Sequence, residues 1–297
     1  MIGSTEGVIL LDKPPGLTSF QALGRVKRAL GMGRVGHAGT LDRFAEGLLL
    51  VLAGRMTRLS GLAMAMDKEY LATVTFGRQT DTLDPEGTVV SEGPVPTRAA
   101  LEAALPSFTG RILQVPPQYS AVHVGGRRAY QVARDGEPVD LEPREITIHH
   151  LSLLSFDPPL ATLRVVCSKG TYIRSLARDV AKRLSTCAYV SQLRRIRIGG
   201  FSVQHAVAPD AFDPARHLMS PSAFFDAAPD LQKLEVREEW LTRASQGFPV
   251  RDSFFQAPPS ADGIYGAFSA DGGLVAVLEK RGASYRYAAA FPRGEAV

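Results

Sequence analysis

The sequence predicts an α+β protein with a mixed, largely antiparallel sheet flanked by helices and loops, followed by a small β-rich domain at the C-terminal end. Three observations support this class. Residues 68–77, KEYLATVTFG, alternate side chains as a half-buried strand does. Residues 171–184, TYIRSLARDVAKRL, gather their apolar side chains into one helical stripe. Near the C-terminus, three short strand-like runs are separated by Gly-containing turns at 271–272 and 281–282.

Length and composition exclude several classes of protein. The 297 residues, 45% hydrophobic and 22% charged, are enough to bury a core without disulfides. We expect no transmembrane helix, because no run of about 18 apolar residues is present. The N-terminal segment lacks the basic region of a signal peptide. Cys167 and Cys187 have no partner at metal-ligand spacing, so we expect free thiols in a reducing cytoplasm and no metal site.

Basic residues are distributed unevenly along the chain, whose net charge is only +4. Residues 164–197 contain nine basic residues and one acidic residue, Asp179. Two smaller basic clusters occupy residues 25–34 and 127–134. Local concentration of positive charge in a weakly basic chain favours a polyanionic partner such as nucleic acid.

The N-terminal elements follow from local signals. Residues 8–11 form an apolar strand that ends at the turn Pro14-Pro15-Gly16. Thr18 or Ser19 then caps a helix that runs to about residue 30 and stops at Gly31. A loop with four glycines in nine residues follows, and an ordered apolar element resumes over residues 45–52.

The middle of the chain alternates regular elements with polar connections. The segment GRQTDTLDPEG after the first predicted strand is a turn-rich connection. We expect a short helix over 97–105, a strand region that Pro116 and Pro117 break, and two further strands over 145–156 and 161–170. Residues 118–145 mix glycines, aromatics and basic residues without periodicity, and the length of this segment favours a binding excursion over a plain loop.

The stretch GHAGTLDRFAEGLLLV places Asp42 directly ahead of the apolar element. Asp42 could cap a helix there, or it could form a covalent intermediate, which requires a cationic partner to lower its pKa. A phosphatase of the haloacid type would need an aspartate where Ala38 stands. A glycosidase would need a second carboxylate, and Glu46 would not obviously face Asp42.

The same stretch resembles the signature of the TruB-type tRNA pseudouridine synthases. Four other segments resemble that family's further motifs in the same order, over roughly residues 8–205: LLDKPPGLTS, KEYLATVTFGRQTDTLDPEG, CSKGTYIRSLARD and YVSQLRRIRIGGF. One position departs from the family, which usually has proline where Arg43 follows Asp42. Proline fixes φ at about −65°, so its absence leaves the loop less preorganised but removes no chemical group.

The resemblance implies a pseudouridine-synthase fold and the isomerisation of uridine to pseudouridine at position 55 in the T-loop of tRNA, without a cofactor. It implies that Asp42 is the nucleophile or the carboxylate that stabilises the ribose, and that Arg174 pairs with it. The edge of the helical stripe, where Arg174 lies, suits that role independently. Tyr70 would stack on the target uracil and is a candidate proton acceptor.

Further residues receive roles by the same resemblance. Tyr172 and Leu193 match positions of the substrate pocket. Because the target uridine must be flipped out of the folded tRNA, His37 would fill the space that it leaves. Lys13 would support the active-site loop. Three arginines are candidate RNA contacts in the predicted RNA-gripping insertion: Arg127, Arg128 and Arg134.

The resemblance also implies a domain organisation and partners. Residues 1–229 would form the catalytic domain, with the insertion at about 118–145, and residues 230–297 a divergent PUA-like RNA-binding domain. The expected partner is the T-arm of tRNA, with no membrane and no obligate protein partner, for a cytoplasmic monomer. Two alternatives stay open. One is a non-catalytic RNA-binding protein on the same scaffold, and the other is a guide-RNA-directed relative, which generally carries terminal extensions.

Overall fold

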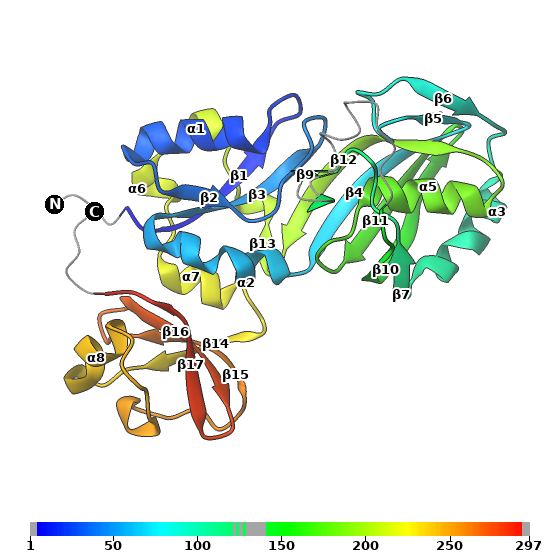
Figure 1. The fold of residues 1–297 in the computed structure, drawn as a ribbon. Helices are drawn as coiled ribbons and strands as arrows, with labels where there is room; N and C mark the ends of the chain where they lie inside the picture. The colour runs from blue at the N-terminus through cyan, green and yellow to red at the C-terminus, as the bar shows by residue number, and fades with distance from the viewer. Residues whose placement is uncertain (1–4, 121–122, 125–126, 129–140, 293–297) are drawn as a thin grey trace.

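The structure, a computed structural model, describes residues 5–120, 123–124, 127–128 and 141–292. Within these residues, nine strands form one long sheet (Figure 1). Its main path runs β1 (Gly7–Lys13), β3 (Glu46–Ala53), β12 (Ala188–Ile198), β4 (Lys68–Phe76), β11 (Leu160–Cys167), β10 (Arg144–Asp157) and β7 (Gly110–Gln114). Two short strands join its side, β2 (Val35–His37) on β3 and β13 (Phe201–Ser202) on β12.

The sheet is mixed but largely antiparallel, as predicted. The pairing of β12 with β3 is parallel, and the other pairings along the path are antiparallel. The parallel pairing places β12 between the N-terminal strands and β4. Consequently β12 is in contact both with the strand that follows the Asp42 loop and with the strand that carries Tyr70.

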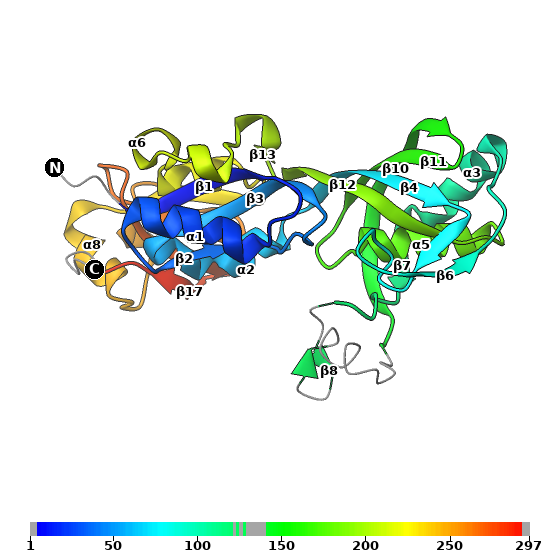
Figure 2. The ribbon, with the colours of Figure 1, turned by 90° about the horizontal axis from the view of Figure 1, so that it is seen from above.

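Burial along the strands explains their sequences. Residues 8–11 of β1 and 48–53 of β3 are buried on both faces, so these strands are continuously apolar. In β4 the side chains of Tyr70, Ala72, Val74 and Phe76 are buried on one face, which yields the alternating pattern. Helix α5 (Ile173–Arg183) lies along that part of the sheet (Figure 2), and its apolar stripe belongs to the same buried cluster.

Side-chain caps mark the starts of two of the predicted helices. Helix α1 (Ser19–Leu30) begins after a capping box between Thr18 and Gln21, and it ends at Gly31, whose φ of 64° is left-handed. Thr97 caps α3 (Arg98–Ala104), which confirms the short helix predicted there. The remaining helices are α2 (Ser60–Ala65), α6 (Pro214–His217), α7 (Pro221–Asp226) and α8 (Leu241–Ser245). Short 3-10 segments lie at Gly54–Leu59, Leu105–Phe108, Val203–His205, Pro209–Ala211, Glu238–Trp240 and Asp252–Phe254.

Two connections contain strands that the sequence patterns did not predict. The polar segment after β4 forms a hairpin of β5 (Arg78–Thr80) and β6 (Val89–Glu92). In the segment 118–145 a second hairpin pairs β8 (His123–Val124) with β9 (Arg127–Arg128), and β8 projects away from the sheet (Figure 2). These strands are only two to four residues long, so their sequences give too little alternation from which to recognise a strand.

A second sheet forms from residue 231 onward, in the order β14 (Leu231–Glu235), β15 (Gly263–Phe268), β16 (Leu274–Arg281) and β17 (Ser284–Ala290). The three predicted strands are β15 to β17, whereas β14 was not predicted and pairs with β15 in parallel. Phe268, Val277 and Phe291 share one hydrophobic cluster with Leu48 and Leu50 of the long sheet. A domain boundary near residue 230 stays a prediction, and this shared cluster joins the two sheets across it.

Three further findings bear on the sequence predictions. Cys167 and Cys187 are both free and buried, as predicted. None of the helices in the described part of the chain has the length and the apolar character of a membrane-crossing helix. In those same residues, no three side chains of His, Cys, Asp or Glu are grouped as a metal site would require.

Candidate active site

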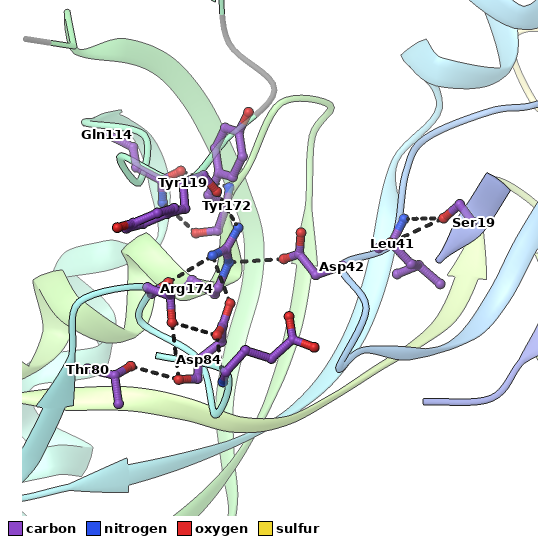
Figure 3. Close-up of polar contacts among 11 residues, drawn as sticks. Ser19, Leu41, Asp42, Thr80, Asp84, Gln114, Tyr119, Tyr172 and Arg174 are labelled. Carbon is purple, nitrogen blue, oxygen red and sulfur yellow. Dashed lines mark hydrogen bonds and ion pairs between the residues drawn. The ribbon is translucent and has the colours of Figure 1, made fainter. Parts of the chain in front are cut away.

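Asp42 lies in the loop between β2 and β3, and the first residue of α1 holds that loop (Figure 3). The buried Ser19 hydroxyl accepts a hydrogen bond from the Leu41 amide at 3.0 Å and donates to the Leu41 carbonyl at 3.2 Å. The element that follows is the strand β3, so the reading of Asp42 as a helix cap is wrong. The helix α1 therefore fixes the backbone next to Asp42 and leaves the carboxylate available.

Arg43, which stands where the family usually has proline, is tied to the loop between β1 and α1. The Gly16 amide donates to the Arg43 carbonyl at 2.8 Å, and Arg43 Nε donates to the Gly16 carbonyl at 3.1 Å. These two hydrogen bonds fix the position of Arg43, just as the Ser19 hydroxyl fixes the position of Leu41. Hydrogen bonds thus restrain the loop at the position where proline would restrain φ.

Arg174 lies in the first turn of α5 and holds two carboxylates (Figure 3). Its Nε lies 3.0 Å from Asp42 Oδ2, and its Nη1 donates to Asp84 Oδ2 at 2.9 Å. Two backbone carbonyls complete its coordination, that of Thr82 at 2.8 Å and that of Tyr119 at 3.0 Å. The guanidinium fork is therefore fixed on several sides and can orient the Asp42 carboxylate.

The sequence patterns did not predict Asp84 as a site residue. It is buried in the turn between β5 and β6, where its Oδ1 accepts from the Thr82 hydroxyl at 2.6 Å and from the Glu86 amide at 3.0 Å. Leu83, just before it, has a φ of 61°, which is unusual for a residue with a Cβ. Asp84 lies in the segment KEYLATVTFGRQTDTLDPEG that resembles a family motif, but by residue type it is an Asp in a polar turn, which solvated turns also contain.

The electrostatic environment of Asp42 differs from the expectation that a cation lowers its pKa. Burial in the surrounding protein raises the pKa of Asp42, and the nearby Asp84 carboxylate raises it further. Arg174 and Lys13 act in the opposite direction, but burial is the largest influence. The Asp42 side chain retains 40% of its accessible surface, whereas that of Arg174 retains 5%, so a substrate can reach the carboxylate and not the arginine.

Tyr70 and Leu193 lie on adjacent strands of the sheet, β4 and β12, and belong to the same buried cluster as Leu41. Burial raises the pKa of the Tyr70 hydroxyl. Tyr172 immediately precedes α5, and the Gln114 side chain holds it, accepting from the Tyr172 amide at 2.8 Å and donating to its carbonyl at 3.1 Å. The fold thus places Tyr70 and Leu193 in the cluster beside the Asp42 loop, and Tyr172 next to the helix that carries Arg174.

Lys13 and His37 lie at the N-terminal side of the site. Lys13 is fully buried, and its ammonium donates to the carbonyls of Pro14 at 3.0 Å and Leu17 at 2.7 Å. Burial lowers the pKa of Lys13 to about 8. Through its two carbonyl contacts Lys13 supports the loop between β1 and α1. Burial also lowers the pKa of His37, whose Nδ1 has no hydrogen-bond partner among the described residues.

The predicted RNA-contact arginines are only partly described. Arg127 and Arg128 form β9, and Arg134 lies outside the described residues. A cavity of about 560 Å³ lies between the two sheets, with Met66, Arg197 and Ile264 in its lining. None of the predicted site residues lines it.

Comparisons with known proteins agree with these landmarks. Residues 27–173 match the model of the TruB family pseudouridylate synthase N-terminal domain. The chain is 40% identical over 290 residues to tRNA pseudouridine synthase B of Caulobacter vibrioides, covering 94% of this chain and 93% of that protein. It is 45% identical over 202 residues to the protein of the same name from Borreliella burgdorferi strain ZS7, covering 67% of this chain and 72% of that one.

Two solved structures share the fold at low sequence identity. A Cbf5-Nop10-Gar1 complex contains a chain that matches with a TM-score of 0.73 at 22% identity, over 97% of this chain and 86% of that chain. An H/ACA RNP bound to a substrate RNA containing 2′-deoxyuridine matches with a TM-score of 0.71 at 21% identity, over 96% and 84%. At such identities the likeness shows the fold, including its C-terminal sheet.

Proposed function

Because the chain belongs to the TruB family of pseudouridine synthases, we propose that it isomerises uridine to pseudouridine at position 55 in the T-loop of tRNA. The reaction breaks the bond between N1 and C1′, turns the uracil, and joins C5 to C1′. C5 loses a proton and N1 gains one, so atoms and electrons balance without a cofactor. The names of the curated relatives support tRNA as the substrate.

The observation that carries the proposal is the single accessible carboxylate held by a buried arginine. Asp42 is the proposed nucleophile on the flipped-out nucleotide, and Arg174 keeps it ionised and aimed. An attack on the ribose, an addition to the base and assistance in abstraction of the 2′-proton all use the same ionised oxygen. In each case the geometry requires that Asp42 approach the nucleotide while Arg174 stays behind it.

The other pocket residues receive roles that fit their positions. Tyr70 stacks on the uracil and is the proposed proton acceptor, since an unstacked base presents its face to an aromatic ring. Leu193 and Tyr172 form the walls of the pocket. His37 fills the space that the flipped nucleotide leaves in the T-loop. Lys13 maintains the loop between β1 and α1 through its two carbonyl contacts.

We propose that two further parts of the chain contact the RNA, the insertion at about 118–145 and residues 230–297. Arg127, Arg128 and Arg134 would bind phosphates of the T-arm, and residues 230–297 would act as a PUA-like domain on the tRNA beyond it. The chain would work as a cytoplasmic monomer without an obligate protein partner. Phosphate contacts of this kind supply affinity, whereas Asp42 supplies chemistry.

The decisive experiment incubates the chain with an unmodified tRNA transcript and maps pseudouridine along it. We expect one product, at position 55, and none in a transcript with cytidine there. Asp42→Asn should abolish the reaction and keep tRNA binding within about twofold, because the phosphate contacts are unchanged. Binding without product by the wild-type chain would indicate a non-catalytic RNA-binding protein. Activity of Asp42→Asn within about tenfold of wild type, about 1.4 kcal/mol of barrier, would refute the role of Asp42.

A further inference from the structure

Arg195 is a buried cation that pairs with no carboxylate in the described part of the chain. It lies on β12 and is 1% exposed. Its neighbours on the strand differ: Arg194 pairs with Asp12 at 2.7 Å, and Arg197 pairs with Glu69 at 2.8 Å. Among the described residues, no carboxylate lies within ion-pair distance of Arg195.

Burial of such a charge is costly, because the guanidinium loses its hydration and no opposite charge replaces it. Two further buried bases increase that cost. Lys13 and Lys68 are both buried near Arg195, and its charge adds to burial in lowering the pKa of each to about 8. This cost raises the question of what the buried guanidinium contributes, and the hydrogen bonds of Arg195 give the answer.

The hydrogen bonds of Arg195 reach the backbone around Asp42. Nε donates to the Leu48 carbonyl at 2.8 Å, and Nη2 donates to the Gly39 carbonyl at 3.0 Å. Gly39 precedes Asp42 by three residues in the same loop, and Leu48 lies on β3, which follows that loop. Arg195 therefore ties the start of the loop to the strand at its end.

The backbone of Arg195 is fixed as firmly as its side chain. It pairs with Gly47 of β3, where a Cβ would lie 2.3 Å from the Arg195 carbonyl oxygen. Gly47 also has a φ of 100°, which only glycine adopts readily. The two strands can thus approach closely enough to place the guanidinium under the loop.

The third contact of Arg195 is Tyr70. The two residues are direct cross-strand partners in the pairing of β12 with β4, and both side chains are buried. Cross-strand partners on one face have neighbouring side chains, and the Arg195 charge acts to lower the pKa of the Tyr70 hydroxyl, which burial raises. One guanidinium thus contacts the ring proposed to stack on the uracil and the loop that carries the proposed nucleophile.

We propose that Arg195 is a positioning residue for the reaction, whose guanidinium fixes the Asp42 loop by hydrogen bonds and, as the cross-strand partner of Tyr70, positions the Tyr70 side chain beside that loop. This inference rests on the proposed function of the site. A charged donor makes a stronger hydrogen bond than a neutral one, and burial strengthens it further. The planar fork of arginine reaches the Leu48 and Gly39 carbonyls in fixed directions, which the single ammonium of lysine does not reproduce.

A double-mutant cycle on single-turnover pseudouridine formation tests the proposal. The arms are Arg195→Lys, Tyr70→Phe and the double variant, with tRNA affinity measured for each. We expect Arg195→Lys to slow the reaction by roughly ten- to a hundredfold, about 1.4–2.7 kcal/mol, and to leave affinity within about twofold. In the Tyr70→Phe background the same change should cost less than about threefold, because contacting residues are not additive.

A matched control is Arg197→Lys, on the same strand, whose partner is Glu69. We expect it to react at the wild-type rate. A wild-type rate for Arg195→Lys would overturn the proposal. An equal cost of Arg195→Lys with and without the Tyr70 hydroxyl would overturn it as well, because Arg195 would then support the fold and not act through Tyr70.

If Arg195→Lys does not fold, an NMR measurement on the wild-type side chain replaces it. The guanidinium ¹⁵N–¹H signals of Arg195 should shift in Tyr70→Phe and stay in place in Tyr189→Phe, a tyrosine on β12 that pairs with Thr75. Unchanged Arg195 signals in Tyr70→Phe would overturn the proposal. This arm also separates the two hypotheses, since a wild-type chain that makes no pseudouridine refutes the proposed function while the Arg195 signals still report the contact.

Discussion

Replacing Asp84 with asparagine should slow pseudouridine formation while the chain stays folded. Asp84 Oδ2 accepts from Arg174 Nη1 at 2.9 Å, and its Oδ1 is held by Thr82 and the Glu86 amide. Asparagine has nearly the same shape but removes the negative charge. Arg174 would then keep Asp42 and its two carbonyl acceptors, so its charge would stay paired.

The size of the effect follows from the contact that is lost. A hydrogen bond between charged groups contributes about 1.5–3 kcal/mol. If most of this free energy serves to orient Arg174, its loss slows the single-turnover reaction by roughly ten- to a hundredfold, since about 1.4 kcal/mol corresponds to a factor of ten. The free energy of unfolding should fall by no more than about 3 kcal/mol, less than for a buried charge left wholly unpaired.

The pH dependence should shift in a direction that misfolding would not mimic. The negative charge of Asp84 raises the pKa of Asp42, so its removal should lower that pKa. Asp42 acts in its ionised form, and the rate is lost as the pH falls through its pKa. The acid limb of the rate profile should therefore move to lower pH in Asp84→Asn, although the plateau rate is lower.

The assay is single-turnover conversion of a tRNA transcript with excess enzyme, measured across the acidic range. Asp81→Asn is the matched control, because it makes the same charge change in the same turn, where Asp81 accepts from the amides of Thr82 and Thr88 at 2.9 Å each. It should retain the wild-type profile. A plateau rate for Asp84→Asn within about twofold of wild type, about 0.4 kcal/mol, would refute the reasoning, as would an acid limb that moves to higher pH.

Three further predictions follow from single contacts. Arg174→Lys should reduce the single-turnover rate by roughly ten- to a thousandfold, about 1.4–4 kcal/mol of barrier, because an ammonium cannot hold two carboxylates in a fork; a full rate would mean that Arg174 does not orient Asp42. Arg43→Ala keeps the backbone bond to Gly16 and loses the one from Nε, so the rate should fall by only about two- to fivefold, or about 0.5–1 kcal/mol; a hundredfold loss would point to a direct contact of Arg43 with RNA. Phe291→Ala should lower the free energy of unfolding in urea by about 3–5 kcal/mol, since Phe291 is 1% exposed in the cluster that joins the two sheets, and a loss below about 1 kcal/mol would show that this cluster contributes little.

Local sequence signals determined the regular elements that bury one face. The alternation in β4, the capping box of α1 and the apolar stripe of α5 each depend on residues a few positions apart. Such signals act before the chain is folded, so they can be read along the sequence. The family resemblance likewise gave Asp42, Arg174 and Tyr70 as site residues, because each lies within a short motif.

The tertiary structure alone decided which distant groups share the site. Asp84 is 90 residues from Arg174, and although it lies in a segment that resembles a family motif, its polar turn gave no sign that it would be buried against Arg174. Arg195 is one of several arginines in a basic segment, and only the approach of β3 and β4 to β12 buries it and leaves its neighbours paired with carboxylates. The pKa of Asp42 depends on the same folding: the sequence shows the cation that lowers it, but the burial that raises it exists only when the surrounding elements have displaced water.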